Sequence, residues 1–162
     1  AARKGGPPVA VAVTAALAAG GDLGRSLECC NRAVERLQDR DGGPVASIPF
    51  AARGDVLLRM DRPREALEDL RHAQDLVRRS PVVFSAIDTA HLLGLAYAAV
   101  GQPRFAGHFL GEALAGIEQV LNLLTSESQR AVFLDDPRRR MVLAAIRELP
   151  AALRGLGNGR NR

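Results

Sequence analysis

A tripeptide that recurs four times constrains the fold of this chain more than any other feature. Its copies are Leu23-Gly24-Arg25, Arg62-Pro63-Arg64, Gln102-Pro103-Arg104 and Asp136-Pro137-Arg138. They begin 39, 40 and 34 residues apart, and each lies between two segments whose apolar residues have helical spacing. A period of this length with two helices per unit is typical of α-helical repeat arrays, which usually bind other proteins.

The composition also favours helices. The chain has 162 residues, 47% of them apolar, which is enough for one domain with a buried core and excludes a disordered chain. It contains five Phe, one Tyr and no Trp, so Leu, Ala and Val must fill most of the core. These residues favour close helix packing over a β-sandwich, and no segment shows the alternation of a strand. We therefore expect an all-α fold.

Breaks in the helical pattern divide the chain into helix pairs. We expect a linker over residues 1–6, a helical repeat domain over 7–154 and a disordered tail over 155–162. The pairs are predicted at 7–39, 44–79, 81–124 and 126–154. The fourth pair would cap the array.

Several residues predict local structure within these pairs. Ser80 is a predicted N-cap with Pro81 as the first helical residue, and Asp136 is a predicted cap before Pro137. Asp69 is expected on a solvated helix face. The buried stripe of the same helix is predicted at Ala66, Leu70, Ala73 and Val77.

The net positive charge of the chain is concentrated near its C-terminal end. Residues 1–136 carry 15 basic and 17 acidic side chains, whereas residues 137–162 carry seven Arg against Glu148 alone. Two interpretations of the triplet Arg138-Arg139-Arg140 stay open. It can be an exposed helix face that pairs with Asp135 and Asp136, or it can contact an acidic protein surface or a nucleic acid backbone.

The third pair resembles a tetratricopeptide repeat. In that family a small residue is followed three positions later by Tyr, then by Ala nine positions further on and by another Ala seven beyond that. Small residues at these positions let two antiparallel helices approach closely. The matching residues are Gly94, Tyr97, Ala106 and Ala113 in the third pair, Gly54, Leu57, Ala66 and Ala73 in the second, and Thr14, Leu17, Ser26 and Ala33 in the first.

The resemblance covers roughly residues 7–124. Two repeats exceed the family's usual length, which is similar to the longer repeats of multidomain bacterial regulators. The resemblance implies a right-handed solenoid of about three helix pairs plus the C-terminal capping pair. It also implies that the chain is a piece of a larger bacterial protein.

The family binds peptides or partner helices on a concave face lined by the first helix of each pair. Carried over to this chain, that groove would be lined by Val11, Ala15, Ala18, Ala19, Ile48, Ala51, Asp55, Leu58, Arg59, Asp88, His91, Leu95, Ala98 and Ala99. Such a groove is small and apolar with a few polar points, which suits a helix or an apolar peptide. Asp55 and Arg59 are four residues apart and can instead pair with each other.

No residue pattern predicts chemistry. His72, His91 and His108 fall on three different helices without metal-ligand spacing, so we expect no metal, no cofactor and no enzyme activity. The adjacent Cys29 and Cys30 indicate a reducing compartment rather than a disulfide framework, and no segment is typical of a signal peptide or a membrane span. We expect a cytoplasmic adaptor or regulatory region with a protein or peptide partner. Nucleic-acid binding through the Arg-rich end and self-association are the alternatives.

Overall fold

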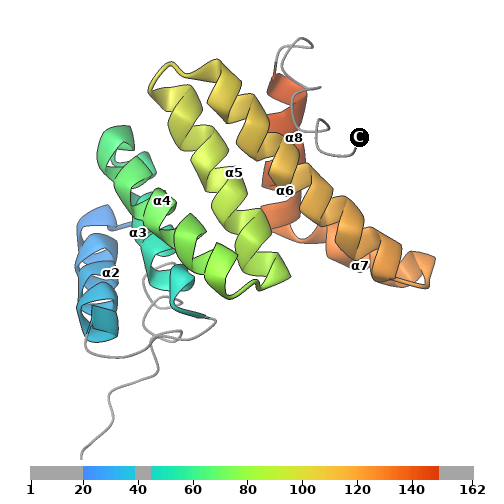
Figure 1. Cartoon of the computed structure of the whole chain (residues 1–162), viewed down its shortest axis with the longest axis horizontal. Coiled ribbons are helices and arrows are strands. Elements are labelled where there is room, and N and C mark those ends of the chain that lie inside the picture. Colours follow the sequence, from blue (N-terminus) through green and yellow to red (C-terminus); the bar gives the residue numbers. More distant parts are fainter. Residues whose placement is uncertain (1–19, 39–44, 150–162) are drawn as a thin grey trace, which may run out of the picture. The chain divides into compact units, whose positions relative to one another are not determined.

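All regular structure in the described part of the chain is helical. The computed structural model describes residues 20–38 and 45–149 (Figure 1). Its helices are α2 (Leu23–Gln38), α3 (Ser47–Arg59), α4 (Pro63–Arg79), α5 (Val83–Ala99), α6 (Pro103–Leu123), α7 (Glu127–Asp135) and α8 (Pro137–Glu148). The predicted all-α class is thereby confirmed for these residues, in which no strand occurs. None of these helices is long and apolar enough to cross a bilayer.

Some predictions fall outside the described residues. These are the linker over 1–6, the first helix of the first pair, the end of the fourth pair and the tail over 155–162. The same holds for six residues assigned through the family resemblance, namely Val11, Thr14, Ala15, Leu17, Ala18 and Ala19.

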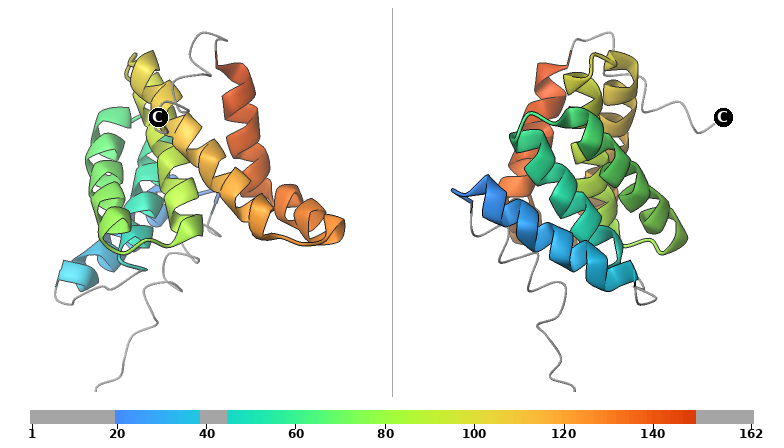
Figure 2. Two further views of the ribbon diagram at one scale, coloured as in Figure 1. Left: turned by 45° about the vertical axis from the view of Figure 1, so that its right-hand side comes forward. Right: turned by 90° about the vertical axis from the view of Figure 1, so that its left-hand side faces the viewer.

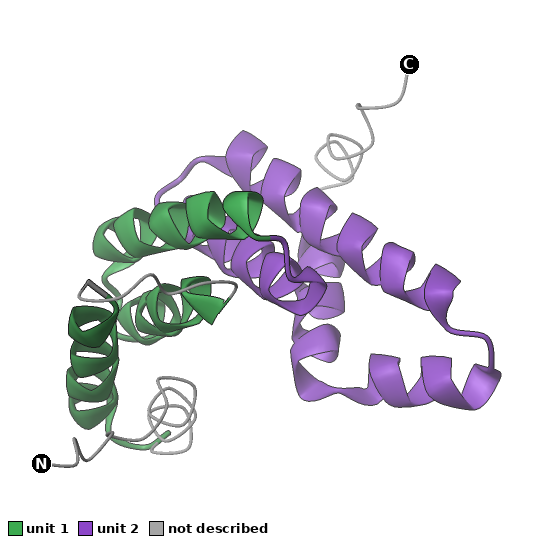
Figure 3. Cartoon of the chain, turned by 60° about the horizontal axis from the view of Figure 1, so that its bottom comes forward, with its two compact units in different colours: residues 1–80 green, residues 81–162 purple. Residues whose placement is uncertain are grey.

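The chain forms two compact units, residues 1–80 and 81–162 (Figure 3). In the first unit, α3 and α4 form a hairpin and α2 packs against α3. In the second unit, α5 and α6 form a hairpin, α8 packs mainly against α6, and the short α7 precedes α8 (Figure 2). Each unit is thus built around one helical hairpin.

The two hairpins turn in the same way. After α3, the Arg62 N–H donates to the Leu57 carbonyl at 2.9 Å, and Asp61 has a φ of 57°. Forty residues later, the Gln102 N–H donates to the Tyr97 carbonyl at 2.9 Å. There Gly101 has a φ of 75°. Both turns are Schellman motifs, in which a residue in the left-handed region ends the first helix.

The helices of each hairpin are closest where a glycine meets a leucine. A Cβ atom built on Gly54 would lie 2.6 Å from Leu70 Cγ, and one on Gly94 would lie 2.5 Å from Leu110 Cγ. Any side chain at these glycines would therefore push α3 from α4, or α5 from α6. The two contacts are 40 residues apart in sequence, as are the two turns.

The predicted buried stripe of α4 is confirmed. Its four members are buried, and so are the residues 40 positions later in α6: Ala106, Leu110, Ala113 and Ile117. In α2 the same register is occupied by Ser26, Cys30 and Ala33, which are also buried. The described residues therefore contain one helix-packing pattern three times, in α2, α4 and α6.

The ends of the helices test the predicted caps. Asp136 caps α8, because its side chain accepts a hydrogen bond from the Arg138 backbone N–H at 2.8 Å. The prediction for Ser80 is wrong, since α5 begins at Val83 with Val82 as its N-cap. Ser80 instead ends α4, where its N–H donates to the Leu76 carbonyl at 3.0 Å.

Candidate functional site

One side of α3 carries the described residues of the first unit that the family resemblance assigns to the groove. Ile48, Ala51 and Leu58 are half-buried, and Arg59 is exposed. Ile48 packs against the core cluster that α2 and α3 share, so part of its apolar surface is already used. The opposite side of α3 is buried through Gly54 and its neighbours. We name Ala51, Asp55, Leu58 and Arg59 the α3 face.

The two charged residues of the α3 face pair with each other. Arg59 donates from Nη2 to Asp55 Oδ2 at 2.9 Å and from Nε to Asp55 Oδ1 at 3.3 Å. Asp55 and Arg59, which are four residues apart, therefore pair with each other, as the alternative interpretation of their spacing predicted. An exposed pair of this kind contributes only about 0.5 kcal/mol, so a partner could separate it at small cost.

The corresponding residues of α5 differ in accessibility. Leu95 is half-buried and Ala98 is exposed, whereas His91 is buried. Asp88 accepts hydrogen bonds from Arg139 at 2.6 Å and from Arg138 at 3.3 Å, both on α8. In the second unit, therefore, α8 of this chain already binds Asp88.

The arginine triplet does not form a uniform basic surface. Arg138 and Arg140 have exposed side chains, but Arg138 pairs with Asp88 and Arg140 with Asp135. Arg139 is only 4% exposed and pairs with Asp88. Arg139 is thus unavailable to a nucleic acid in this conformation. Arg138 shares the Asp88 carboxylate with Arg139, and Asp135 offsets the charge of Arg140.

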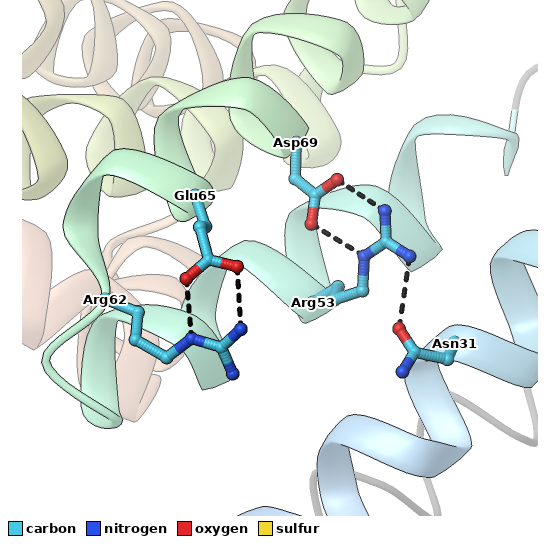
Figure 4. A network of polar contacts seen from close by, with 5 residues as sticks. All are labelled: Asn31, Arg53, Arg62, Glu65 and Asp69. Carbon is cyan, nitrogen blue, oxygen red and sulfur yellow. Dashed lines mark hydrogen bonds and ion pairs between the residues drawn. The ribbon is translucent and has the colours of Figure 1, made fainter.

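A polar network in the first unit connects three helices (Figure 4). Arg53 of α3 donates to both carboxylate oxygens of Asp69 in α4, at 2.7 and 2.6 Å, and to Asn31 Oδ1 of α2 at 3.1 Å. Asp69 is 8% exposed, so its predicted place on a solvated face is wrong. The sequence contained a signal against a solvated position, because the residue 40 positions later, in α6, is the aromatic Phe109.

Arg53 in this network and the nearby Cys30 have shifted pKa values. The hydrogen bond to Asp69 raises the pKa of Arg53, so the guanidinium stays charged at all relevant pH values. Burial raises the pKa of the Cys30 thiol to about 11, because the thiolate would lose its hydration. Both cysteines are free, and Cys30 is therefore a protonated core residue at neutral pH.

The histidines contact ordinary neighbours. His72 packs edge-on against Phe50, with 4.3 Å between the ring centres, and His108 Nε2 lies 3.3 Å from Glu112 Oε1. Within residues 20–38 and 45–149 no three His, Cys, Asp or Glu side chains are grouped as metal ligands would be. The described residues therefore offer helix surfaces, rather than a reactive cluster, as the candidate site.

Comparison with known proteins identifies no relative: no family model, no curated protein and no solved structure matches the chain.

Proposed function

We propose that the chain is a protein–protein interaction module, a right-handed array of helix pairs of the tetratricopeptide type. In this proposal it acts as an adaptor or regulatory region and binds a peptide or a helix of another protein. The recurrence of one turn and one glycine–leucine contact at an interval of 40 residues supports it. The proposal assigns no catalysis and no cofactor, and the free cysteines favour a reducing compartment such as the cytoplasm.

The α3 face carries the proposal. Ala51 and Leu58 present partly exposed apolar surface beside a charged pair, while the other side of α3 is fixed by its contact with α4. A face held on a packed helix needs little ordering when a partner binds, which lowers the entropic cost of association. The spacing of its residues suits an extended peptide or an amphipathic helix that lies along α3.

Site-specific photocrosslinking tests this assignment. A photoreactive amino acid is placed at position 58 on the α3 face or, as a control, at position 68, because Glu68 is exposed on α4. In cells that make the protein, we expect a discrete protein adduct from position 58 and none from position 68. With the probe moved to position 51, Leu58→Glu should abolish the adduct, whereas Glu68→Lys should leave it unchanged.

Equal adducts from positions 58 and 68 would contradict the proposal. So would an adduct that survives Leu58→Glu while circular dichroism shows an unchanged helix content. Capture that disappears at high salt but ignores Leu58→Glu would instead favour the arginine-rich end and an acidic or nucleic-acid ligand.

Self-association is a second candidate, favoured by three exposed apolar side chains on α6, α7 and α8. Leu123 is 72% exposed, Val132 75% and Met141 52%. Exposed apolar side chains that form a contiguous patch are typical of protein interfaces. Sedimentation at increasing concentration tests it. A mass that rises with concentration in the wild type and stays monomeric in Leu123→Glu/Val132→Glu would support it.

A further inference from the structure

An arginine of this chain fills a site that is built to bind a guanidinium group. Arg139 Nη1 lies 2.6 Å from Asp88 Oδ1. Its guanidinium carbon lies 5.5 Å from the centre of the Phe84 ring and 5.6 Å from that of Phe133. We name Asp88, Phe84 and Phe133 the arginine site.

The arginine site distinguishes arginine from other side chains. A planar guanidinium can donate hydrogen bonds at its edge while its faces contact aromatic rings. A lysine ammonium is a compact, strongly hydrated charge, so it loses more when two rings exclude water from it. The centres of the Phe84 and Phe133 rings are 6.2 Å apart, so both rings lie to one side of the guanidinium, and Asp88 accepts one hydrogen bond from it. These contacts favour arginine over lysine.

An apolar surface continues from the arginine site. Val142 lies three residues after Arg139 on α8, is fully buried, and belongs to one cluster with Ile87 of α5 and Ile117 of α6. Leu143 and Ile146 of α8 are half-buried against the same cluster. The hairpin α5–α6 thus binds a helix that has arginine at one position and apolar residues three, four and seven positions later.

Few side chains of the helix that occupies this surface are buried. Val142 is the only fully buried apolar residue of α8, and α7, which precedes it, has no buried residue.

We propose that α8 is a displaceable internal ligand and that the surface beneath it binds an arginine-bearing amphipathic helix of a partner protein. The charge complementarity between Asp88 and a guanidinium identifies this occupant. The proposal rests on the proposed function, because it names the chemistry of one partner and how access to it is controlled. It concerns α5 and α6 of the second unit, whereas the α3 face belongs to the first unit.

Binding of the chain's own helix, supplied as a peptide, tests the proposal. The probe is a fluorescent peptide of residues 134–149. The receptors are the full-length chain and its Val142→Asp variant, in which a buried carboxylate would detach α8. By fluorescence anisotropy, we expect the peptide to bind Val142→Asp at least tenfold more tightly than wild type, because wild-type α8 competes for the surface.

Matched peptides test the arginine site itself. Arg139→Gln in the peptide should weaken binding at least tenfold, whereas Arg140→Gln, the same loss of charge at an exposed position, should change it less than twofold. Asp88→Asn, added to the Val142→Asp receptor, should weaken binding of the parent peptide at least as much, because Arg138 also pairs with Asp88. Equal affinity of the two substituted peptides would overturn the proposal, and so would no binding to a folded Val142→Asp chain.

Hydrogen exchange on the wild-type chain tests the proposal without any variant, so the result does not depend on whether a variant folds. Backbone amides of α8 should exchange at least a hundredfold faster than those of α5 and α6, and equal protection would overturn the proposal. Exchange of α8 between two copies would be detected as a dimer that Arg139→Gln dissociates, which would overturn the assignment to a partner. Receptor and peptide both come from this chain, so these outcomes do not depend on whether Leu58→Glu affects partner binding.

Discussion

The hairpins α3–α4 and α5–α6 share a turn and a glycine–leucine contact but differ in the side chains beside that contact. In the first hairpin, Arg53 and Asp69 form a bidentate ion pair. The equivalent positions of the second hold Leu93 and Phe109, and Phe109 stacks on Tyr97 with 5.4 Å between ring centres. Two different chemistries thus stabilise one backbone geometry.

This difference shows which positions define the hairpin. Where two helices nearly touch, only the size of the side chain matters, and both hairpins have glycine opposite leucine there. One position away, either a satisfied ion pair or an aromatic stack can fill the space, because each leaves no unpaired buried charge. A repeat in this chain is therefore defined by a few positions at which the size of the side chain is restricted.

The largest expected effect comes from the shared contact. Leu70→Ala and Leu110→Ala should each lower the free energy of unfolding by about 3 kcal/mol, since both side chains are buried against a glycine that cannot fill the cavity. Urea unfolding followed by circular dichroism measures the loss. Leu123→Ala, at an exposed position, should cost less than about 0.5 kcal/mol. A loss in one hairpin but not in the other would show that they are not equivalent.

A smaller effect is expected where the hairpins differ. Asp69→Ala should cost about 2 kcal/mol, because it leaves the half-buried Arg53 without its carboxylate partner. Glu68→Ala, one residue away and exposed, should have almost no effect. The double variant Arg53→Leu/Asp69→Phe introduces the residues of the second hairpin and should recover most of the loss in the same unfolding assay. If the double variant is less stable than Asp69→Ala, the ion pair and the aromatic stack are not interchangeable.

The smallest effect is expected at the turns. Asp61 adopts a left-handed conformation, which glycine adopts without strain. Asp61→Gly should therefore raise the melting temperature slightly, through a gain of at most about 1 kcal/mol. Gly101→Asp should lower it by a similar amount, because nothing lies within 4 Å of a Cβ there and only the backbone conformation is penalised. Shifts of the same sign in both variants would refute this explanation.

Much of the fold could be predicted because its signals are local. The bounds of α4, residues 63–79, follow from the proline at its first position and from apolar residues spaced at three and four. Ser80 shows the limit of such signals. The same residue can end one helix or begin the next, and here its hydrogen bond to Leu76 assigns it to α4.

The candidate site could be predicted less well, because burial of a charged residue depends on residues far away in the sequence. Asp69 and Arg139 are charged residues of the kind that usually lies on a solvated helix face. Both are nevertheless buried, beside partners that are 16 and 51 residues away in the sequence. His91 was expected to line a groove and is buried. Periodicity alone cannot distinguish a charged residue that faces water from one that faces an opposite charge on another helix.

The sequence by itself determined the helical class, the 40-residue register and the positions where helices must approach closely, because helix periodicity, caps and side-chain size act within a few residues. Only the tertiary structure decided that Arg53 bridges α2 and α4 and that Arg139 occupies a site made of Asp88, Phe84 and Phe133. An ion pair forms only where folding brings its two partners together, and no local pattern encodes the distance between two helices.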